Sequence, residues 1–253
     1  MSSSTRTIAF FGASTGVGLA ALKKSLAQGH TCIVLLRTPS KLDAHFPPQT
    51  RPANLIIREG NAHDDAAVTS CLTVSNSQPP KLVDVVFTSI GAPPTITMGG
   101  FTIADPDVCK KGMSCLLTSL TTLRSQGFTG SPRIIAISTM GHSRHGRDIA
   151  LPMIPIYKLF VSVPAADKQV MEDRLGASGE RNWVVVRPSH LVDGEQEEKE
   201  VRVGIEDIEK GVEKLEIGYT ISREDVGRWC FEKLVQPKEV NWEYARKAVS
   251  VTW

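Results

Sequence analysis

The sequence of 253 residues has no long apolar run and no excess of one charge. No apolar stretch approaches the roughly 20 residues of a membrane-spanning helix, so we expect no membrane insertion. The formal net charge of +2 at pH 7 gives no electrostatic reason to expect nucleic-acid binding. The five cysteines are odd in number and show no C-x-x-C spacing, which predicts free thiols in a reducing compartment.

What is present is the composition of an ordinary globular domain. Hydrophobic residues make up 41% of the chain and charged residues 22%. The length suits one α/β domain over residues 1–253, with a substantial buried core. The N-terminal MSSSTR is polar, and no apolar signal core follows it except the first predicted strand, so we expect a cytoplasmic protein.

One stretch, TIAFFGASTGVGLAALKKSL at residues 7–26, predicts a strand, a glycine turn and a helix. A helix N-terminus with free N–H groups holds a pyrophosphate, and glycines let the backbone approach the phosphates. This order therefore predicts a dinucleotide site; a purely structural glycine turn is the alternative. Its expected cofactor contacts are Gly12, Ser14, Thr15, Gly16, Val17 and Gly18.

The residues after the second predicted strand, TCIVLL at 31–36, indicate which nicotinamide cofactor binds. An NAD enzyme usually has an acid there for the ribose 2′-hydroxyl. This chain has Arg37 and, close by, Lys41, which suit the 2′-phosphate of NADP. We therefore expect NADP(H) as the cofactor; the alternative is that Arg37 is a solvated loop residue.

The glycine spacing G-x-x-x-G-x-G resembles that of the short-chain dehydrogenase/reductase superfamily. Later segments make the chain similar to its atypical NAD(P)H-binding branch, which includes NmrA-like proteins and biliverdin-IXβ/flavin reductases. The resemblance implies a single-domain Rossmann-type α/β fold, a doubly wound, mostly parallel sheet of about seven strands with helices on both faces. It also implies cofactor contacts near later strand ends, at Asn61, Ala62, Ile90, Gly91 and Pro188.

The same resemblance suggests residues for catalysis. Residues 165–179 are similar to the family stretch Y-x-x-x-K-x-x-x-E, with Lys168 and Glu172 in place and Pro164 where the family has its proton-donating Tyr. Lys168 is expected to hold the nicotinamide ribose, unless it forms an i,i+4 salt bridge with Glu172. Ser138 or Thr139, at the end of the strand 133–138, is the candidate for polarising a substrate carbonyl.

Two histidines are candidates for proton transfer, because histidine titrates near neutral pH. His190 follows the Arg-Pro pair in P-S-H, and His142 lies in the segment 140–164; local packing is the alternative role for His190. His142 and His145 are three residues apart, but no Cys or Glu completes a tetrahedral set, so we expect no metal site.

Three loops, at about residues 92–104, 140–164 and 193–217, are expected to border the substrate. Met98 and Phe101 are candidate pocket residues, and the equal alternative is that they pack their loop onto the core. The acidic stretch 193–216 is predicted to be a mobile lid, in which residues 198–205 alternate weakly and indicate a hairpin; VSVTW at 249–253 is predicted to be a last strand at the sheet edge. Asp105-Pro106 and Ser222, the latter with Asp225 three residues on, predict the starts of two later helices.

The predicted function is an NADPH-dependent reductase that transfers a hydride to an aromatic, quinone-like or other carbonyl small molecule, without the family Tyr. The protonating group is then His190, His142 or solvent. An NmrA-like regulator that binds NADP(H) without turnover, and a non-redox isomerase, cyclase or dehydratase, are the alternatives, since fold alone does not choose among them. The sequence predicts a small-molecule partner, and leaves a monomer and a homodimer both open.

Overall fold

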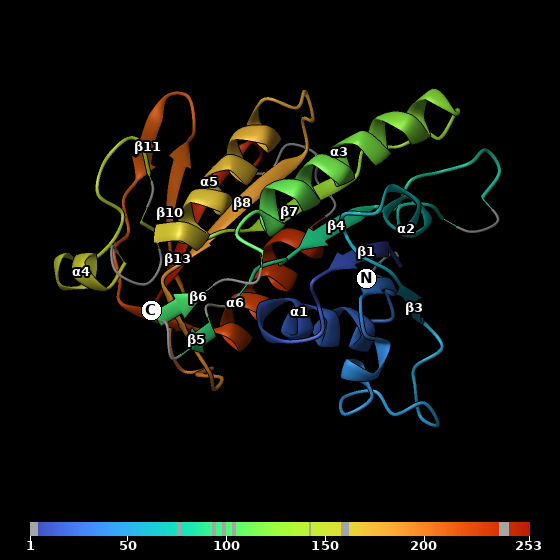
Figure 1. The fold of residues 1–253 in the computed structure, drawn as a ribbon, viewed down its shortest axis with the longest axis horizontal. Coiled ribbons are helices and arrows are strands. Elements are labelled where there is room, and N and C mark those ends of the chain that lie inside the picture. Colours follow the sequence, from blue (N-terminus) through green and yellow to red (C-terminus); the bar gives the residue numbers. More distant parts are fainter. Residues whose placement is uncertain are drawn as a thin grey trace.

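A nine-stranded sheet forms the centre of the computed structural model, in the order β11-β10-β13-β8-β7-β4-β1-β2-β3 (Figure 1). The structure describes residues 5–74, 77–92, 95–97, 100–102, 105–141, 143–157, 162–237 and 243–253. The strands of the sheet are β1 (Thr7–Phe11), β2 (Thr31–Leu36), β3 (Leu55–Glu59), β4 (Val85–Thr88), β7 (Arg133–Ile137), β8 (Trp183–Pro188), β10 (Arg202–Asp207), β11 (Gly211–Lys214) and β13 (Lys247–Thr252).

The sheet is doubly wound, as the sequence predicts. β1 pairs in parallel with β2 on one side and with β4 on the other, so Ile8 faces Cys32 and Val85 in register. The chain runs outward from β1 to β3, then returns to place β4 on the other flank of β1. Ligands of such sheets bind outside the carboxyl ends of the strands, at this reversal.

Helices cover both faces of the sheet. Ile8 and Phe10 of β1 point toward the layer of α1 and α6, whereas Ala9 and Phe11 point toward the layer of α2, α3 and α5 (Figure 1). This alternation buries both faces of the central strands, which explains their continuous apolar sequences. The helices are α1 (Gly16–Ala27), α2 (Asp65–Cys71), α3 (Val108–Ser125), the short α4 (Ile154–Ile156), α5 (Ser162–Gly176) and α6 (Arg223–Cys230).

Two helix starts show how local and distant signals compete. Ser222 caps α6 as its sequence predicts, because its hydroxyl accepts from the Asp225 N–H at 2.9 Å. The predicted start of α3 at Asp105-Pro106 is wrong, since the helix begins at Val108. Its free N–H groups are instead capped by a carboxylate from another helix, Asp167 of α5, which accepts from Cys109 at 2.7 Å and Lys110 at 3.0 Å.

One further expectation about the C-terminal part is wrong, and the predicted hairpin lies later in the chain than expected. β13 is not an edge strand: it lies between β8, to which it is parallel, and β10, to which it is antiparallel. Within the predicted lid, β10 and β11 form a hairpin that extends the main sheet at its edge. The alternation of residues 198–205 is weak because only the central residues of β10, such as Gly204 and Ile205, are buried.

Smaller elements surround the strand ends. Two-stranded pairs form between β5 (Thr95–Thr97) and β6 (Gly100–Thr102) and between β9 (His190–Val192) and β12 (Thr220–Ser222), and short turns of helix are η1 (Pro39–Leu42), η2 (Leu151–Met153) and η4 (Phe231–Val235). Met98 and the side chain of Phe101 lie outside the described part of the chain. Within the described residues, no helix is both long and apolar enough to cross a membrane.

Candidate functional site

A cavity of about 600 Å³, called here the carboxyl-end cavity, opens where β1, β2, β3, β4 and β7 end. Most of the residues that the sequence predicts for the cofactor and for catalysis line it. They are Gly12, Ser14, Thr15, Gly16, Val17, Arg37, Lys41, Asn61, Ala62, Ile90, Gly91, Ser138 and Lys168. Residues from six segments, far apart in the sequence, therefore meet at the reversal of the sheet.

Close backbone contacts account for two of the glycines. Gly12 has a φ of +85°, and a Cβ there would lie 2.8 Å from the Ile90 nitrogen. A Cβ on Gly18 would lie 2.2 Å from the Ser89 Oγ, which itself donates to the Gly12 carbonyl at 2.9 Å. Gly18 thus allows α1 to pack against the end of β4; it does not itself line the cavity.

Lys168 joins the ends of two neighbouring strands. Its Nζ donates to the Ile90 carbonyl after β4 at 2.7 Å and to the Ile137 carbonyl at the end of β7 at 2.5 Å. Its ammonium group is held at the cavity wall by these bonds and not by an i,i+4 pair. Glu172, the alternative partner, binds Arg187 instead.

Ser138 directly follows Ile137 and presents an unused hydroxyl. Its side chain lines the carboxyl-end cavity although the residue is only 5% exposed. Among the described residues, its Oγ has no hydrogen-bond partner. Buried polar atoms without a partner are rare in native proteins, so this hydroxyl retains unused hydrogen-bonding capacity.

Thr139, the other candidate, is engaged elsewhere. It hydrogen-bonds Tyr157, and burial raises the pKa of that phenol. Tyr157 packs with Met140 and Ile149, and neither Thr139 nor Tyr157 is among the cavity residues. Tyr157 therefore does not replace the missing family Tyr, whose position is taken by Pro164 in the cavity wall.

Three other predicted residues are not placed in this cavity. His190 begins β9 with its side chain exposed, and Pro188 is buried at the end of β8; neither lines the cavity. His142 lies outside the described residues. His190 points away because strand residues alternate between faces, and it is Leu191 that faces the cavity.

Sequence reasoning missed several cavity residues. Cys109 donates its thiol to the Ile90 carbonyl at 3.3 Å, and burial raises its pKa to about 11, so it stays a neutral thiol. Asp167 lines the cavity while capping α3. Arg223, at the start of α6, reaches across to the glycine turn, and only the tertiary contact between α1 and α6 reveals it.

Behind the cavity, a buried group of ions anchors α5. Arg187 of β8 binds Glu172 of α5, with Nη2 to Oε2 at 2.6 Å, and Glu206 of β10, with Nη1 to Oε1 at 3.0 Å. The Ser143 hydroxyl donates to Glu206 at 2.5 Å. These bonds connect the helix that carries Lys168 to the added hairpin and to the loop after β7.

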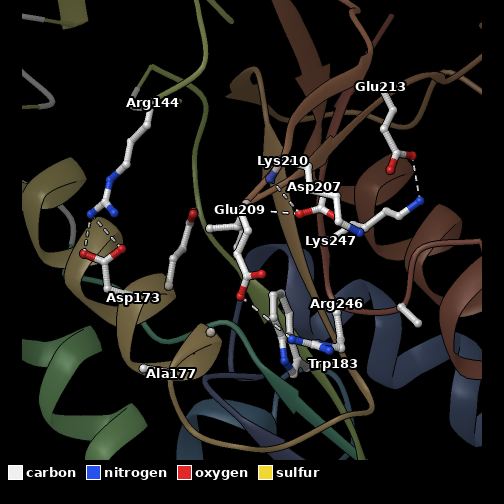
Figure 2. A pocket seen from close by; sticks show the side chains of 14 residues that line it. Arg144, Asp173, Ala177, Trp183, Asp207, Glu209, Lys210, Glu213, Arg246 and Lys247 are labelled. Carbon is white, nitrogen blue, oxygen red and sulfur yellow. Dashed lines mark hydrogen bonds and ion pairs between the residues drawn. The ribbon is translucent and has the colours of Figure 1, made fainter.

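A second cavity, of about 790 Å³ and called here the amino-end cavity, lies at the opposite, amino ends of β8 and β13 (Figure 2). Charged side chains surround it in pairs, including Arg144 with Asp173 at 2.6 Å and Lys247 with Glu213 at 2.6 Å. Trp183 lies among them in Figure 2. The opposite charges neutralise one another, and no predicted cofactor or catalytic residue lines this cavity.

The fold is similar to that of solved short-chain dehydrogenases/reductases. A structure of such an enzyme from Veillonella parvula, in complex with NADP, covers 99% of this chain and 95% of its own with a TM-score of 0.70 and 14% identity. ChuY, an anaerobillin reductase from Escherichia coli O157:H7, covers 97% of this chain and 96% of its own, with a TM-score of 0.65 and 16% identity. At these identities the likeness concerns the fold.

The sequence profile of the NAD(P)H-binding family matches residues 12–237, and the chain belongs to this family. It is 37% identical to the reductase pytE of Aspergillus terreus over 271 residues, covering all of both chains. It is 31% identical to the oxidase pynE of Aspergillus niger, covering 90% of this chain and 92% of the relative. The expected class, an NAD(P)H-dependent oxidoreductase, is thus confirmed.

Proposed function

We propose that the protein is an NADPH-dependent reductase that acts on the carbonyl group of an aromatic or quinone-like small molecule. The observation that carries this proposal is Ser138, which lines the same cavity as the glycine turn and Lys168 and whose buried hydroxyl has no hydrogen-bond partner among the described residues. A hydroxyl without a partner, beside a nicotinamide site, suits a carbonyl oxygen that acquires negative charge.

The charges around the cavity favour the phosphorylated cofactor over NADH. Arg37 and Lys41 line the cavity next to the end of β2 with exposed side chains, and their positive charges suit a 2′-phosphate. The relative from Veillonella parvula is in complex with NADP, which agrees with this choice. The first turn of α1 carries no acidic residue that would repel a phosphate.

NADPH, when bound, supplies the hydride that goes to the carbonyl carbon. Ser138 donates a hydrogen bond to the carbonyl oxygen, and Lys168 fixes the ends of β4 and β7 so that this hydroxyl stays in place. One proton, which completes the reduction, goes to the oxygen. With Pro164 in place of the Tyr, we assign it to solvent that enters beside Ser138.

The experiment is NADPH oxidation, followed by absorbance, with a panel of quinones, flavins and polycyclic aromatic ketones. We expect turnover that falls by about 10²-fold in Ser138→Ala, because a donor to a developing oxyanion is lost. Ser119→Ala is the matched control: Ser119 is equally buried, on α3, but does not line the cavity, and we expect unchanged turnover. Equal losses in the two variants would refute the role of Ser138.

An NmrA-like regulator is the second candidate, and the observation that favours it is Pro164, because it removes the family proton donor from the cavity wall. A regulator binds NADPH and NADP with different affinities and turns over no compound of the panel. Calorimetry with both redox states, run beside the turnover assay, separates the two functions.

A further inference from the structure

Arg223 occupies a position over the first residue of α1. A Cβ built on Gly16 would lie 3.3 Å from the Arg223 Cδ and 3.9 Å from its Nε, so the two are in close contact. The Arg223 side chain also lines the carboxyl-end cavity. Its guanidinium group therefore lies where the glycine turn presents the N-terminus of α1.

Arg223 is attached only loosely in this position. Its Nη1 contacts the Asp193 Oδ1 at 2.7 Å, but the Asp193 side chain is 84% exposed and that of Arg223 34%. Exposed pairs of this kind contribute little to stability. Asp193 belongs to a turn that is held on α6 by other bonds, from the Gly194 N–H to Glu224 and from the Gln196 N–H to Asp225.

The glycine turn lacks its own neutralising groups. Thr15 makes no side-chain capping bond at the start of α1, and the first turn of the helix contains no acid. The partial positive charge of the helix terminus and the Arg223 guanidinium thus lie side by side. Together they suit a doubly charged anion better than either does alone.

We propose that Arg223 binds the pyrophosphate of the bound dinucleotide. In the absence of the dinucleotide, Asp193 holds the arginine in place, and the phosphate then replaces the Asp193 carboxylate as its partner. This inference rests on the proposed function, because it requires NADPH in the carboxyl-end cavity. It assigns different phosphates to different cations: Arg223 binds the pyrophosphate that NADH and NADPH share, and Arg37 binds the 2′-phosphate that only NADPH has.

The test is isothermal titration calorimetry with NADPH, NADH and 2′-AMP. Arg223→Gln is expected to weaken NADPH and NADH equally, by about tenfold or more, because a charge-assisted bond is lost, and to leave 2′-AMP unchanged. Arg37→Gln is expected to weaken NADPH and 2′-AMP and to leave NADH unchanged. Asp193→Asn is expected to raise the affinity for both dinucleotides by up to about fivefold, because that factor corresponds to the free energy of an exposed ion pair.

Two further variants control for folding and for general charge effects. Arg223→Lys keeps the charge without the planar donor group and is expected to bind with intermediate affinity. Arg246→Gln removes an exposed arginine, paired with Glu209 at 3.9 Å beside the amino-end cavity of Figure 2, and is expected to change no affinity.

The outcomes separate this inference from the proposed function. If the wild type binds NADPH and Arg223→Gln binds both dinucleotides as tightly as the wild type does, the role of Arg223 is overturned and the reductase proposal stands. Loss of NADPH binding alone in Arg223→Gln overturns the assignment to the pyrophosphate. A wild-type protein that binds neither dinucleotide refutes both proposals.

Discussion

Replacing Arg187 with methionine removes one charge from the most buried ion group of the described structure. The side chains of Arg187, Glu172 and Glu206 are 6%, 4% and 9% exposed. Methionine keeps most of the apolar stem of arginine, so packing changes little and the effect reports on charge. Two buried carboxylates, Glu172 and Glu206, then lose the guanidinium group that they share.

Breaking a buried pair by removing one partner costs about 3–5 kcal/mol, because the remaining charge is uncompensated. A domain of this kind typically has about 5–15 kcal/mol of unfolding free energy in all, so the loss is a large share of the total. The pKa of Arg187 is raised by its two carboxylate partners in spite of burial, so the guanidinium stays charged across the accessible pH range. The cost of the substitution therefore does not depend on titration of the arginine.

The assay is urea unfolding of Arg187→Met and of the wild type, with the free energy of unfolding extrapolated to water. Arg202→Met is the matched control, since the Arg202–Glu216 pair at 2.8 Å is 43% and 21% exposed and should cost less than about 1 kcal/mol. The triple variant Arg187→Met with Glu172→Gln and Glu206→Gln should regain most of the loss. A loss in Arg187→Met no larger than in the control would refute the reasoning.

Three more predictions follow from single contacts. Gly18→Ala places a Cβ 2.2 Å from the Ser89 Oγ, so we expect a loss of about 1–3 kcal/mol in thermal unfolding and weaker NADPH binding by calorimetry; an unchanged midpoint would contradict it. The pKa of Asp225 is lowered, because hydrogen bonds outweigh burial. Its stabilisation is therefore present above about pH 4 and lost as the pH falls through the lowered native value, so the stability gap to Asp225→Asn should close only in acid. Pro164→Tyr puts a phenol one helical turn before Lys168 in the cavity wall, and carbonyl reduction should gain rate and a new pH dependence; a profile identical to the wild type would argue against it.

The parts of the fold that follow from local sequence were predicted well. Neighbouring residues predict the glycine turn, the apolar parallel strands and the cap at Ser222. Backbone geometry and strand burial both produce recognisable patterns over a few residues. The predicted start of α3 was wrong because Asp167, far away in the sequence, supplies the cap. The place of β13 was wrong because edge and inner positions of an apolar strand look alike in sequence.

For the site, the residue types were predicted more reliably than their partners. Lys168, Ser138 and the glycine turn come together, since all follow or face strand ends at the reversal of the sheet. The positions of His190 and Thr139 near strand ends make them candidates, but the direction of a side chain depends on the pleat and on neighbours such as Tyr157. The contact of Arg223 with the glycine turn arises from the packing of α6 against α1, which joins segments far apart in the sequence.

The NAD(P)H-binding fold class and the elements that build the crevice follow from the sequence, because they depend on short-range periodicity, glycine geometry and strand composition. Three features of the cavity are seen only in the folded chain: the hydroxyl of Ser138 without a partner among the described residues, the two carbonyl partners of Lys168, and the contact of Arg223 with the glycine turn. These features arise from packing between segments that are distant in the chain. Burial, hydrogen-bond satisfaction and side-chain direction are properties of that packing.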